Sequence, residues 1–517
     1  MLVKVYSAAV QGIEAITVTI EVDVIGSSVP SYSLVGSPDS SVRESYDRVR
    51  CALAAGKYKF PNGRVVVNMA PADIRKEGAG YDLPQAIAIA AAAGQITDHE
   101  ERLRKCMFVG ELSLDGVIHP CPGILPVAIR AREEGFESLI VPQQNAREAA
   151  VVDKLKVYGA NNLSQVIRHL NGVEQMEPTE VDTRAEFFSH IEQFDIDYAD
   201  VKGQDTVKRA FEVAAAGGHN LIMVGPPGAG KSMMAKRIHT ILPPLTLHEA
   251  LETTKIHSVA GQTHQDTTLM TKRPFRSPHH TISDAALIGG GATPKPGEIS
   301  LAHHGVLFLD ELPEFKRQVL EVLRQPLEDR QITISRARQT LTYPASFMLI
   351  ASMNPCPCGY FNHPTHPCSC TPGAVQRYLG KISGPLLDRI DLQVEITPVP
   401  YEKLSEKTQG ESSAAIRERV LRARKIQQER YANDGSRIFC NAQMGSAQLR
   451  QYAQLNEKCS KILQQAMQSL CLSARAYDRI LKVARTIADL DGSAEINEMH
   501  LSEAIGYRNL DREGWGT

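Results

Sequence analysis

The sequence predicts an α/β fold in which a parallel-sheet core is followed by a helical lid and preceded by a separate α/β domain. Three observations support this prediction. A glycine-rich segment at 225–232 lies between an apolar strand and a helix. Short apolar strands alternate with helices over residues 195–400, a pattern typical of parallel sheets. Residues 410–510 lack strand signals and repeat apolar positions with helical spacing, as at Ile480 and Val483.

The domain organisation follows from length and from these patterns. The chain has 517 residues, too many for one compact core, and domains of about 100–200 residues make three the expected number. We expect the N-terminal α/β domain over residues 1–172 and an acidic linker without a strand pattern over 173–194. The parallel-sheet core is expected over 195–400 and the helical lid over 401–517.

The composition, 43% hydrophobic and 22% charged residues, is ordinary for a soluble globular protein. No apolar run approaches the ~18 residues needed to cross a bilayer. The N-terminus lacks the layout of a signal peptide, so we expect a cytoplasmic protein without a membrane partner. Because the formal net charge is −2, any binding to nucleic acid would depend on local basic patches.

Four segments define the expected N-terminal domain. Residues 16–24 alternate apolar and polar side chains, which predicts a strand. Residues 65–69 and 138–142 are short apolar runs that predict further strands. Residues 83–93 are rich in alanine and isoleucine, which predicts a buried helix.

The glycine-rich segment fits the phosphate-binding pattern G-x-x-x-x-G-K-[ST]. It reads Gly225-Pro226-Pro227-Gly228-Ala229-Gly230-Lys231-Ser232. The glycines allow backbone N–H groups to surround phosphate oxygens, Lys231 would reach the β- and γ-phosphates, and the Ser232 hydroxyl would bind Mg²⁺. A strand at 221–224 and a helix at 233–242 supply the expected context, which disfavours a chance glycine-rich turn.

Two further strands end in polar residues suited to nucleotide hydrolysis. The apolar run at 306–309 leads into Asp310, which would hold Mg²⁺ through water, and Glu311, which would polarise the attacking water. Taken alone, such a pair would more often start a solvated helix, but the phosphate-binding pattern upstream disfavours that alternative. A third strand at 347–351 runs to Asn354, which can orient the water, although an isolated asparagine is more often a turn residue.

Residues 384–391 place Arg389 after a helix-like start. A guanidinium offered to the γ-phosphate of a neighbouring subunit would stabilise charge in the transition state. The alternative is a local ion pair with Asp388 or Asp391. Spacing alone does not decide between the two interpretations.

These motifs together resemble the AAA+ ATPases, and within them the magnesium-chelatase-like branch and its YifB/ComM family. The resemblance covers nearly the whole chain. Its most specific segments are residues 274–281, 305–314, 354–359 and 383–392.

The resemblance implies ATP and Mg²⁺ as ligands, with the glycine-rich loop as Walker A and the Asp-Glu pair as Walker B. It implies that Asn354 is sensor 1, that Arg389 is the arginine finger, and that Arg475 is a sensor 2 residue that touches the γ-phosphate. It also implies that Gly203 and Gln204 line the adenine pocket. Without the family, Arg475 would be one more solvated helix charge. Such proteins form ring homo-oligomers, usually hexamers, with each site shared by two subunits.

The N-terminal region is similar to the Lon-protease catalytic fold over residues 76–80 and 109–116. Lon proteases use a serine nucleophile and a lysine base. The resemblance places Gly80 where the serine belongs and Leu125 where the lysine belongs. We therefore expect a Lon-protease-like domain without peptidase activity, which serves in binding or assembly.

Four cysteines cluster in one segment, whereas the other six are scattered and are expected to be reduced and structural. Four thiolates could form a tetrahedral Zn²⁺ site, although the C-x-C spacing is tighter than the usual C-x₂-C. His363 and His366 lie between the two pairs and could substitute as ligands. The alternative is a loop of reduced thiols. The four residues are Cys356, Cys358, Cys368 and Cys370.

Two basic segments suggest DNA as the partner on which the motor acts. Related helicases grip the phosphate backbone with such segments inside the ring, and the YifB/ComM branch is tied to branch migration during DNA uptake and recombination. A solvated charged face is the alternative for either segment. The first segment is Lys272, Arg273, Phe275, Arg276, His279 and His280. The second lies on or beside an expected hairpin strand at 331–336 and is Arg330, Arg336 and Arg338.

Two other substrates stay open. A chelatase subunit would need a partner with a D-x-S-x-S metal motif, and this chain carries no such run. A protein remodeller would usually present an aromatic pore loop, for which Phe275 is the one weak candidate. ATP-driven translocation or branch migration on DNA is therefore the favoured function.

Overall fold

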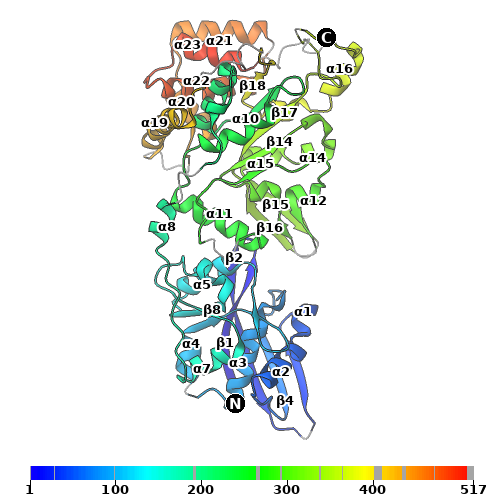
Figure 1. The fold of residues 1–517 in the computed structure, drawn as a ribbon, viewed down its shortest axis with the longest axis vertical. Helices are drawn as coiled ribbons and strands as arrows, with labels where there is room; N and C mark the ends of the chain where they lie inside the picture. The colour runs from blue at the N-terminus through cyan, green and yellow to red at the C-terminus, as the bar shows by residue number, and fades with distance from the viewer. Residues whose placement is uncertain are drawn as a thin grey trace.

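The computed structural model describes residues 2–27, 29–97, 99–189, 194–263, 268–291, 294–336, 339–361, 363, 365–400, 410–432, 438–470 and 472–508. The molecule is elongated, and three units follow one another along its length (Figure 1). The N-terminal unit (blue to cyan) lies at one end. The core (green to yellow) follows it, and the C-terminal helices (orange to red) pack beside the far end of the core.

The N-terminal unit is built on a mixed seven-stranded sheet in the order β3-β4-β2-β1-β5-β8-β9. Strands β1 and β2 form a long antiparallel pair, whereas β1, β5, β8 and β9 run parallel. The strands are β1 (Leu2–Gln11), β2 (Glu14–Ile25), β3 (Ser31–Val35), β4 (Arg64–Ala70), β5 (Cys106–Phe108), β8 (Ser138–Pro142) and β9 (Lys156–Ala160), with a separate ribbon of β6 (Glu111–Leu112) and β7 (Ile118–His119).

Helices cover this sheet, and the predicted buried helix is confirmed as α3, in which every residue from Leu83 to Ala91 is buried. The predicted strands at 16–24, 65–69 and 138–142 are confirmed as parts of β2, β4 and β8. The helices are α1 (Ser40–Arg43), α2 (Ser45–Ala55), α3 (Asp82–Ala92), α4 (His99–Arg104), α5 (Ile124–Glu133), α6 (Ala146–Ala149) and α7 (Leu163–Leu170).

The core contains a five-stranded sheet in the order β11-β14-β17-β10-β18, and each neighbouring pair runs parallel. The predicted parallel-sheet core is thereby confirmed. Its strands are β10 (Leu221–Val224), β11 (Phe275–Arg276), β14 (Val306–Leu309), β17 (Met348–Met353) and β18 (Leu392–Glu395). Two antiparallel ribbons accompany them, β12 (Gly289–Gly290) with β13 (Lys295–Pro296) and β15 (Gln331–Arg336) with β16 (Gln339–Pro344).

Both faces of this sheet are buried, which explains its continuous apolar strands. Along β10, Leu221 and Met223 face a hydrophobic core shared with the C-terminal helices. Ile222 and Val224 face a second core that includes the β15–β16 hairpin. The helices of the core are α9 (Asp205–Gly217), α10 (Lys231–Arg237), α11 (Leu247–Ala260), α12 (Asp284–Ile288), α13 (Glu298–Leu301), α14 (Arg317–Glu321), α15 (Arg324–Asp329), α16 (Pro372–Leu379) and α17 (Gly384–Leu387).

The C-terminal unit is helical in the residues that the structure describes, as the sequence predicts. Its longest helices, α19 and α22, bury apolar side chains against α9 of the core. The helices are α19 (Ser413–Tyr431), α20 (Ser446–Tyr452), α21 (Glu457–Ser469), α22 (Ala474–Leu490) and α23 (Glu498–Gly506). Within the described ranges, no helix has both the length and the apolar content needed to cross a membrane.

The segment expected to be a linker contains a short helix, α8 (Thr183–Ser189). Phe187 is buried in a hydrophobic cluster formed by the N-terminal unit and by residues of the core, including Ala250 of α11. Glu186 accepts hydrogen bonds from Arg147 of the N-terminal unit and from Thr268 of the core. This part of the linker therefore joins the two units by packing as well as by chain connection.

Candidate active site

The candidate site lies where three neighbouring strands of the core sheet end. Strands β14, β17 and β10 are adjacent and parallel, so their carboxyl ends meet at one edge. Residue 225 follows β10, Asp310 follows β14, and Asn354 follows β17. Segments far apart in the sequence are therefore brought together where ligands of open α/β sheets usually bind.

The glycine-rich loop has the backbone that its sequence requires. Gly228 and Gly230 adopt positive φ angles of 77° and 88°, which side-chain-bearing residues rarely adopt. Gly225 lies so close to the backbone carbonyl of Ile396 that an added Cβ would collide with it. Gly230 caps α10, which starts at Lys231 and continues as a 3₁₀ turn at Ile238–Thr240.

Lys231 connects this loop to the end of β17. Its Nζ donates to the carbonyl oxygens of Gly225 at 2.6 Å and Pro226 at 2.9 Å, and to Asn354 Oδ1 at 3.0 Å. Burial lowers the pKa of the lysine from its usual value, whereas the nearby carboxylates of Asp310 and Glu311 oppose this shift. The candidate lysine and the candidate sensor asparagine are therefore in direct contact.

Asp310 accepts hydrogen bonds on both carboxylate oxygens. Ser232 Oγ donates to Oδ2 at 2.6 Å, Ser352 Oγ donates to Oδ1, and the Glu311 backbone N–H donates to Oδ1 at 3.0 Å. A hydroxyl beside a carboxylate is the pair of oxygen ligands that Mg²⁺ takes in phosphate-loop enzymes, so this donor set fits the metal. Ser352 was not predicted from the sequence as a residue of the site. Its position on β17, two residues before Asn354, is the signal that could have identified it.

Glu311 has an unusual backbone conformation for a residue with a side chain. Its φ is 53°, in the left-handed region, at the sharp turn from β14 into the 3₁₀ turn at Leu312–Glu314. The side chain is 58% exposed, and its Oε2 lies 3.6 Å from His280 Nδ1. This turn leaves the carboxylate exposed beside His280, a neighbour that the sequence did not reveal.

Arg389 is buried inside its own subunit, with only 7% of its side chain exposed. Its Nη2 lies 2.6 Å from Glu328 Oε1, and it also donates to the carbonyls of Arg324 and Pro385. Its ion-pair partner is Glu328 of α15, not Asp388 or Asp391. The arginine-finger role stays a prediction, and it requires the guanidinium to leave this ion pair.

Asp391, only 1% exposed, links the core to the C-terminal unit. It accepts a hydrogen bond from Arg479 of α22 at 2.8 Å and one from the Asn220 backbone N–H at 3.1 Å, and His219 lies 3.3 Å away. Burial alone would raise the pKa of Asp391, but the Arg479 guanidinium and the hydrogen bond with His219 hold this pKa well below its usual range. The arginine on α22 that contacts the core is therefore Arg479.

Arg475 lies one helical turn earlier, in the first turn of α22. Its side chain is exposed and makes no hydrogen bond or ion pair with the described part of the chain. Its proposed contact with a γ-phosphate stays a prediction.

The predicted adenine segment lies near the end of β18. Gln204 is buried and donates from Nε2 to the Thr397 carbonyl at 2.8 Å. Gly203 adopts a positive φ of 65° in the turn before α9. The structure thus fixes this segment beside the chain that follows β18, and its role in adenine binding stays a prediction.

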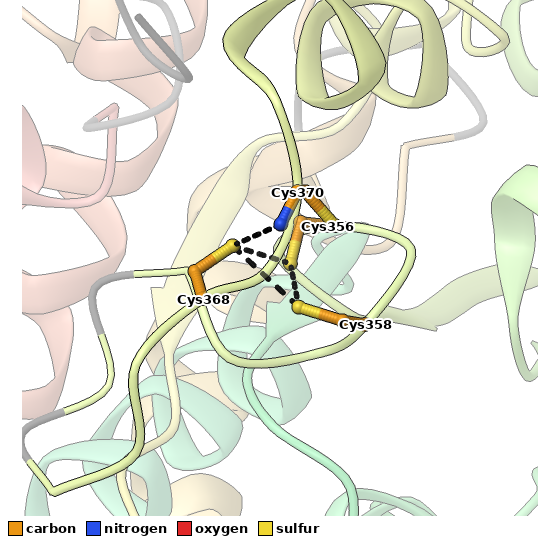
Figure 2. Close-up of side chains that lie close together, drawn as sticks. All are labelled: Cys356, Cys358, Cys368 and Cys370. Atoms are coloured by element: carbon orange, nitrogen blue, oxygen red, sulfur yellow. Dashed lines mark hydrogen bonds between the residues drawn. The ribbon is translucent and has the colours of Figure 1, made fainter.

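The four clustered cysteines converge on one point of the loop after β17 (Figure 2). Their sulfur atoms all lie within 4.8 Å of one another. The arrangement is compatible with a metal ion held by four thiolates.

The first basic segment is largely neutralised by acidic partners. Arg273 is mostly buried, and its guanidinium lies 3.1 Å from Glu249 and donates to the His304 carbonyl. Arg276 makes a two-point ion pair with Glu298, with both N···O distances at 2.6 Å. Neither arginine is therefore placed as a free phosphate contact.

The second basic segment lies at the β15–β16 hairpin, whose existence the structure confirms. Arg330 precedes β15 and is half-buried. The Arg336 side chain and Arg338 lie outside the described residues.

Gly80, one of the two Lon-like positions, borders a cleft of about 1550 Å³ between the N-terminal unit and the core. Gly80 lines this cleft beside Cys121, and Lys295 and Tyr343 of the core contribute to its wall. Leu125 is fully buried in α5. Neither predicted position offers a nucleophile or a base.

Comparisons with known families match most of the chain to magnesium-chelatase models. The family described as magnesium chelatase, subunit ChlI, matches residues 197–404, and its C-terminal family matches residues 410–508. A third model, subunit ChlI of Mg-chelatase, matches residues 20–145.

Among individual proteins, the competence protein ComM of Haemophilus influenzae is 45% identical over 509 residues, which cover 98% of this chain and 97% of that protein. The uncharacterised protein YifB of Escherichia coli is 44% identical over 515 residues, with 98% and 97% covered. Lon protease 2 of Bacillus subtilis is 29% identical over 154 residues, 27% of this chain and 26% of the protease.

Proposed function

Because the chain belongs to the YifB/ComM family of magnesium-chelatase-like AAA+ ATPases, we propose that it is a ring-forming motor that uses ATP to move on DNA. One observation carries the ATPase part of this proposal. At the edge of the core sheet, one hydrogen bond joins Lys231 to Asn354 and another joins the adjacent residue, Ser232, to Asp310. The motifs that the sequence separates by up to 123 positions thus form one site.

Each residue of the site has a separate role in phosphoryl transfer. The glycine-rich loop and Lys231 bind the phosphates, Asn354 orients the attacking water, and Glu311 accepts its proton. Ser232 and Asp310 would hold Mg²⁺, which when bound supplies positive charge against the phosphate oxygens. Ser352 fixes the orientation of the Asp310 carboxylate.

Assembly into a ring, most simply a hexamer, would let a neighbouring subunit complete each site. In this proposal Arg389 exchanges its ion pair with Glu328 for the γ-phosphate of the adjacent subunit. Arg475 contacts the γ-phosphate from the C-terminal unit, and Gly203 and Gln204 line the adenine pocket. The Lon-like unit, which lacks peptidase residues at Gly80 and Leu125, serves in binding or assembly.

DNA is the proposed substrate for two reasons. A relative that covers nearly the whole chain is named a competence protein, and the family resemblance connects this branch to DNA uptake and recombination. The chain also offers a hairpin, β15–β16, in which β15 ends at Arg336, and Arg338 follows two positions later in the sequence. The segment at 272–276 contributes less, because Arg273 and Arg276 are paired with carboxylates.

ATPase activity measured with single-stranded, duplex and forked DNA tests this function. We expect DNA to stimulate turnover, Glu311→Gln to abolish turnover while ATP still binds, and Lys231→Ala to weaken nucleotide binding itself. If the Glu311→Gln variant hydrolysed ATP at the wild-type rate, the assignment of Glu311 as the base would be wrong.

A chelatase-like or protein-remodelling ATPase is the second candidate. The neutralisation of Arg273 and Arg276 favours it, because a DNA motor gains nothing from basic residues that are already paired. This candidate would replace the DNA motor if the rate of ATP hydrolysis did not change with any nucleic acid but increased with a protein partner.

A further inference from the structure

The segment between β17 and α16 holds four cysteines but has little structure of its own. Its described residues, 354–361, 363 and 365–371, form no helix or strand. Cys356 is fully buried, whereas Cys358, Cys368 and Cys370 are half-buried. Loops of this length without secondary structure are uncommon in compact domains and usually need another source of order.

Three of the four sulfurs have the spacing expected around a single tetrahedral metal ion. Cys356 Sγ lies 3.3 Å from Cys358 Sγ and 3.7 Å from Cys368 Sγ, and the last two sulfurs are 3.5 Å apart (Figure 2). A Zn–S bond of about 2.3 Å gives a tetrahedral S···S edge of about 3.8 Å, close to these values. A disulfide would need sulfurs about 2.05 Å apart.

Other ligand sets and other centres fit less well. His363 Nδ1 accepts the backbone N–H groups of Thr365 and His366, so this nitrogen is already used. An iron–sulfur cluster distributes its cysteines over several irons. Four sulfurs that all lie within 4.8 Å of one another fit one ion better than a cluster.

The loop is also in contact with the nucleotide site. It begins with Asn354, the residue that Lys231 contacts. Gly359, with a φ of 86°, packs so closely on the Walker A loop that an added Cβ would lie 2.5 Å from Pro227 Cδ. The conformation of the cysteine loop therefore bears on both the sensor asparagine and the phosphate-binding turn.

We propose that Cys356, Cys358, Cys368 and Cys370 bind one structural Zn²⁺ per chain, and that this ion holds the loop against Pro227 and braces the Walker A turn. The metal site stands independently of the proposed function, whereas the bracing rests on the proposed nucleotide site. Ligation closes the loop between its two cysteine pairs and supplies the stability that apolar packing does not.

Metal analysis of the full-length protein, purified without chelator, tests the site. We expect about one zinc per chain in the wild type and less than about 0.2 in the Cys368→Ser/Cys370→Ser double variant. Cys51→Ser, which changes an exposed cysteine outside the cluster, is the matched control and should keep its zinc. Absence of zinc from the wild type, iron in its place, or equal loss in the control would overturn the site.

Nucleotide binding tests the bracing separately. The double variant should bind a fluorescent non-hydrolysable ATP analogue at least about fivefold more weakly than Cys51→Ser. Gly359→Ala should also weaken nucleotide binding but keep its zinc. Gly373→Ala, where no atom lies within 4 Å of the added Cβ, should keep both its zinc and its nucleotide affinity. Unchanged affinity in a zinc-free variant would refute the bracing and leave the metal site standing. If Cys51→Ser also failed to bind the nucleotide, the proposed nucleotide site itself would be wrong.

Discussion

Ser352→Ala tests whether the carboxylate of Asp310 is oriented by its neighbours on the sheet. Asp310 accepts three hydrogen bonds, from Ser232 Oγ, Ser352 Oγ and the Glu311 backbone N–H. Ser352 is fully buried, so no solvent can replace its hydroxyl without rearrangement. A hydrogen bond to a charged group contributes about 1.5–3 kcal/mol, and the lower value corresponds to about a tenfold change in an equilibrium constant.

We therefore expect Ser352→Ala to weaken the Mg²⁺-dependent part of ATP binding about tenfold. The assay is titration of a fluorescent ATP analogue at several Mg²⁺ concentrations, with the same titration in EDTA as reference. Because Ser352 would act through the carboxylate of Asp310, which is proposed to bind Mg²⁺, affinity in EDTA should change little.

Ser300→Ala is the matched control for this experiment. Ser300 is also a fully buried serine of the core, but its Oγ has no hydrogen-bond partner in the described part of the chain. Removing an unsatisfied hydroxyl should leave Mg²⁺-dependent binding unchanged. The reasoning is refuted if the two variants show the same Mg²⁺ dependence.

Three further predictions concern the loop and the contact between core and C-terminal unit. Gly225→Ala should abolish nucleotide binding because its methyl group would collide with a backbone carbonyl, whereas Gly506→Ala, in open space, should bind normally by the same titration. Asp391→Asn removes the buried carboxylate that pairs with Arg479 of α22 and should destabilise the protein by about 3 kcal/mol; unchanged urea unfolding would contradict this. Burial lowers the pKa of Lys482 to about 8 from 10.5. Between these pH values the unfolded chain binds more protons, so stability rises with pH. Lys482→Met should therefore raise Tm most near pH 7 and least above pH 10.5. The exposed Lys458→Met is the control. A rise in Tm that does not depend on pH, or an equal rise in the control, would contradict the burial of a charged Lys482 as the cause.

The strands and the motifs of the core could be predicted because their signals are local. A strand buried on both faces must be apolar throughout, as 306–309 is, and a loop that surrounds phosphates must contain glycine where φ is positive. The family resemblance, read from segments such as 274–281, was confirmed by relatives that align over 98% of the chain.

The partners of individual side chains were harder to predict. The sequence suggested Asp388 or Asp391 as ion-pair partners of Arg389, but the guanidinium binds Glu328, 61 positions away, because α15 packs beside it. Likewise α8 was expected to be part of a plain linker. Its seven residues are too few to form a stable helix alone, and its order comes from packing between two units.

The sequence by itself determined the α/β class, the glycine-rich loop and the acidic pair, because each depends on residue types at fixed short spacings. Only the tertiary structure decided that Ser352 orients Asp310, that Gly359 packs on Pro227, and that four cysteines converge on one point. The physical reason is that hydrogen bonds and van der Waals contacts act over a few ångströms of space. The strand order β14-β17-β10, which no local pattern encodes, sets which distant residues come within that range.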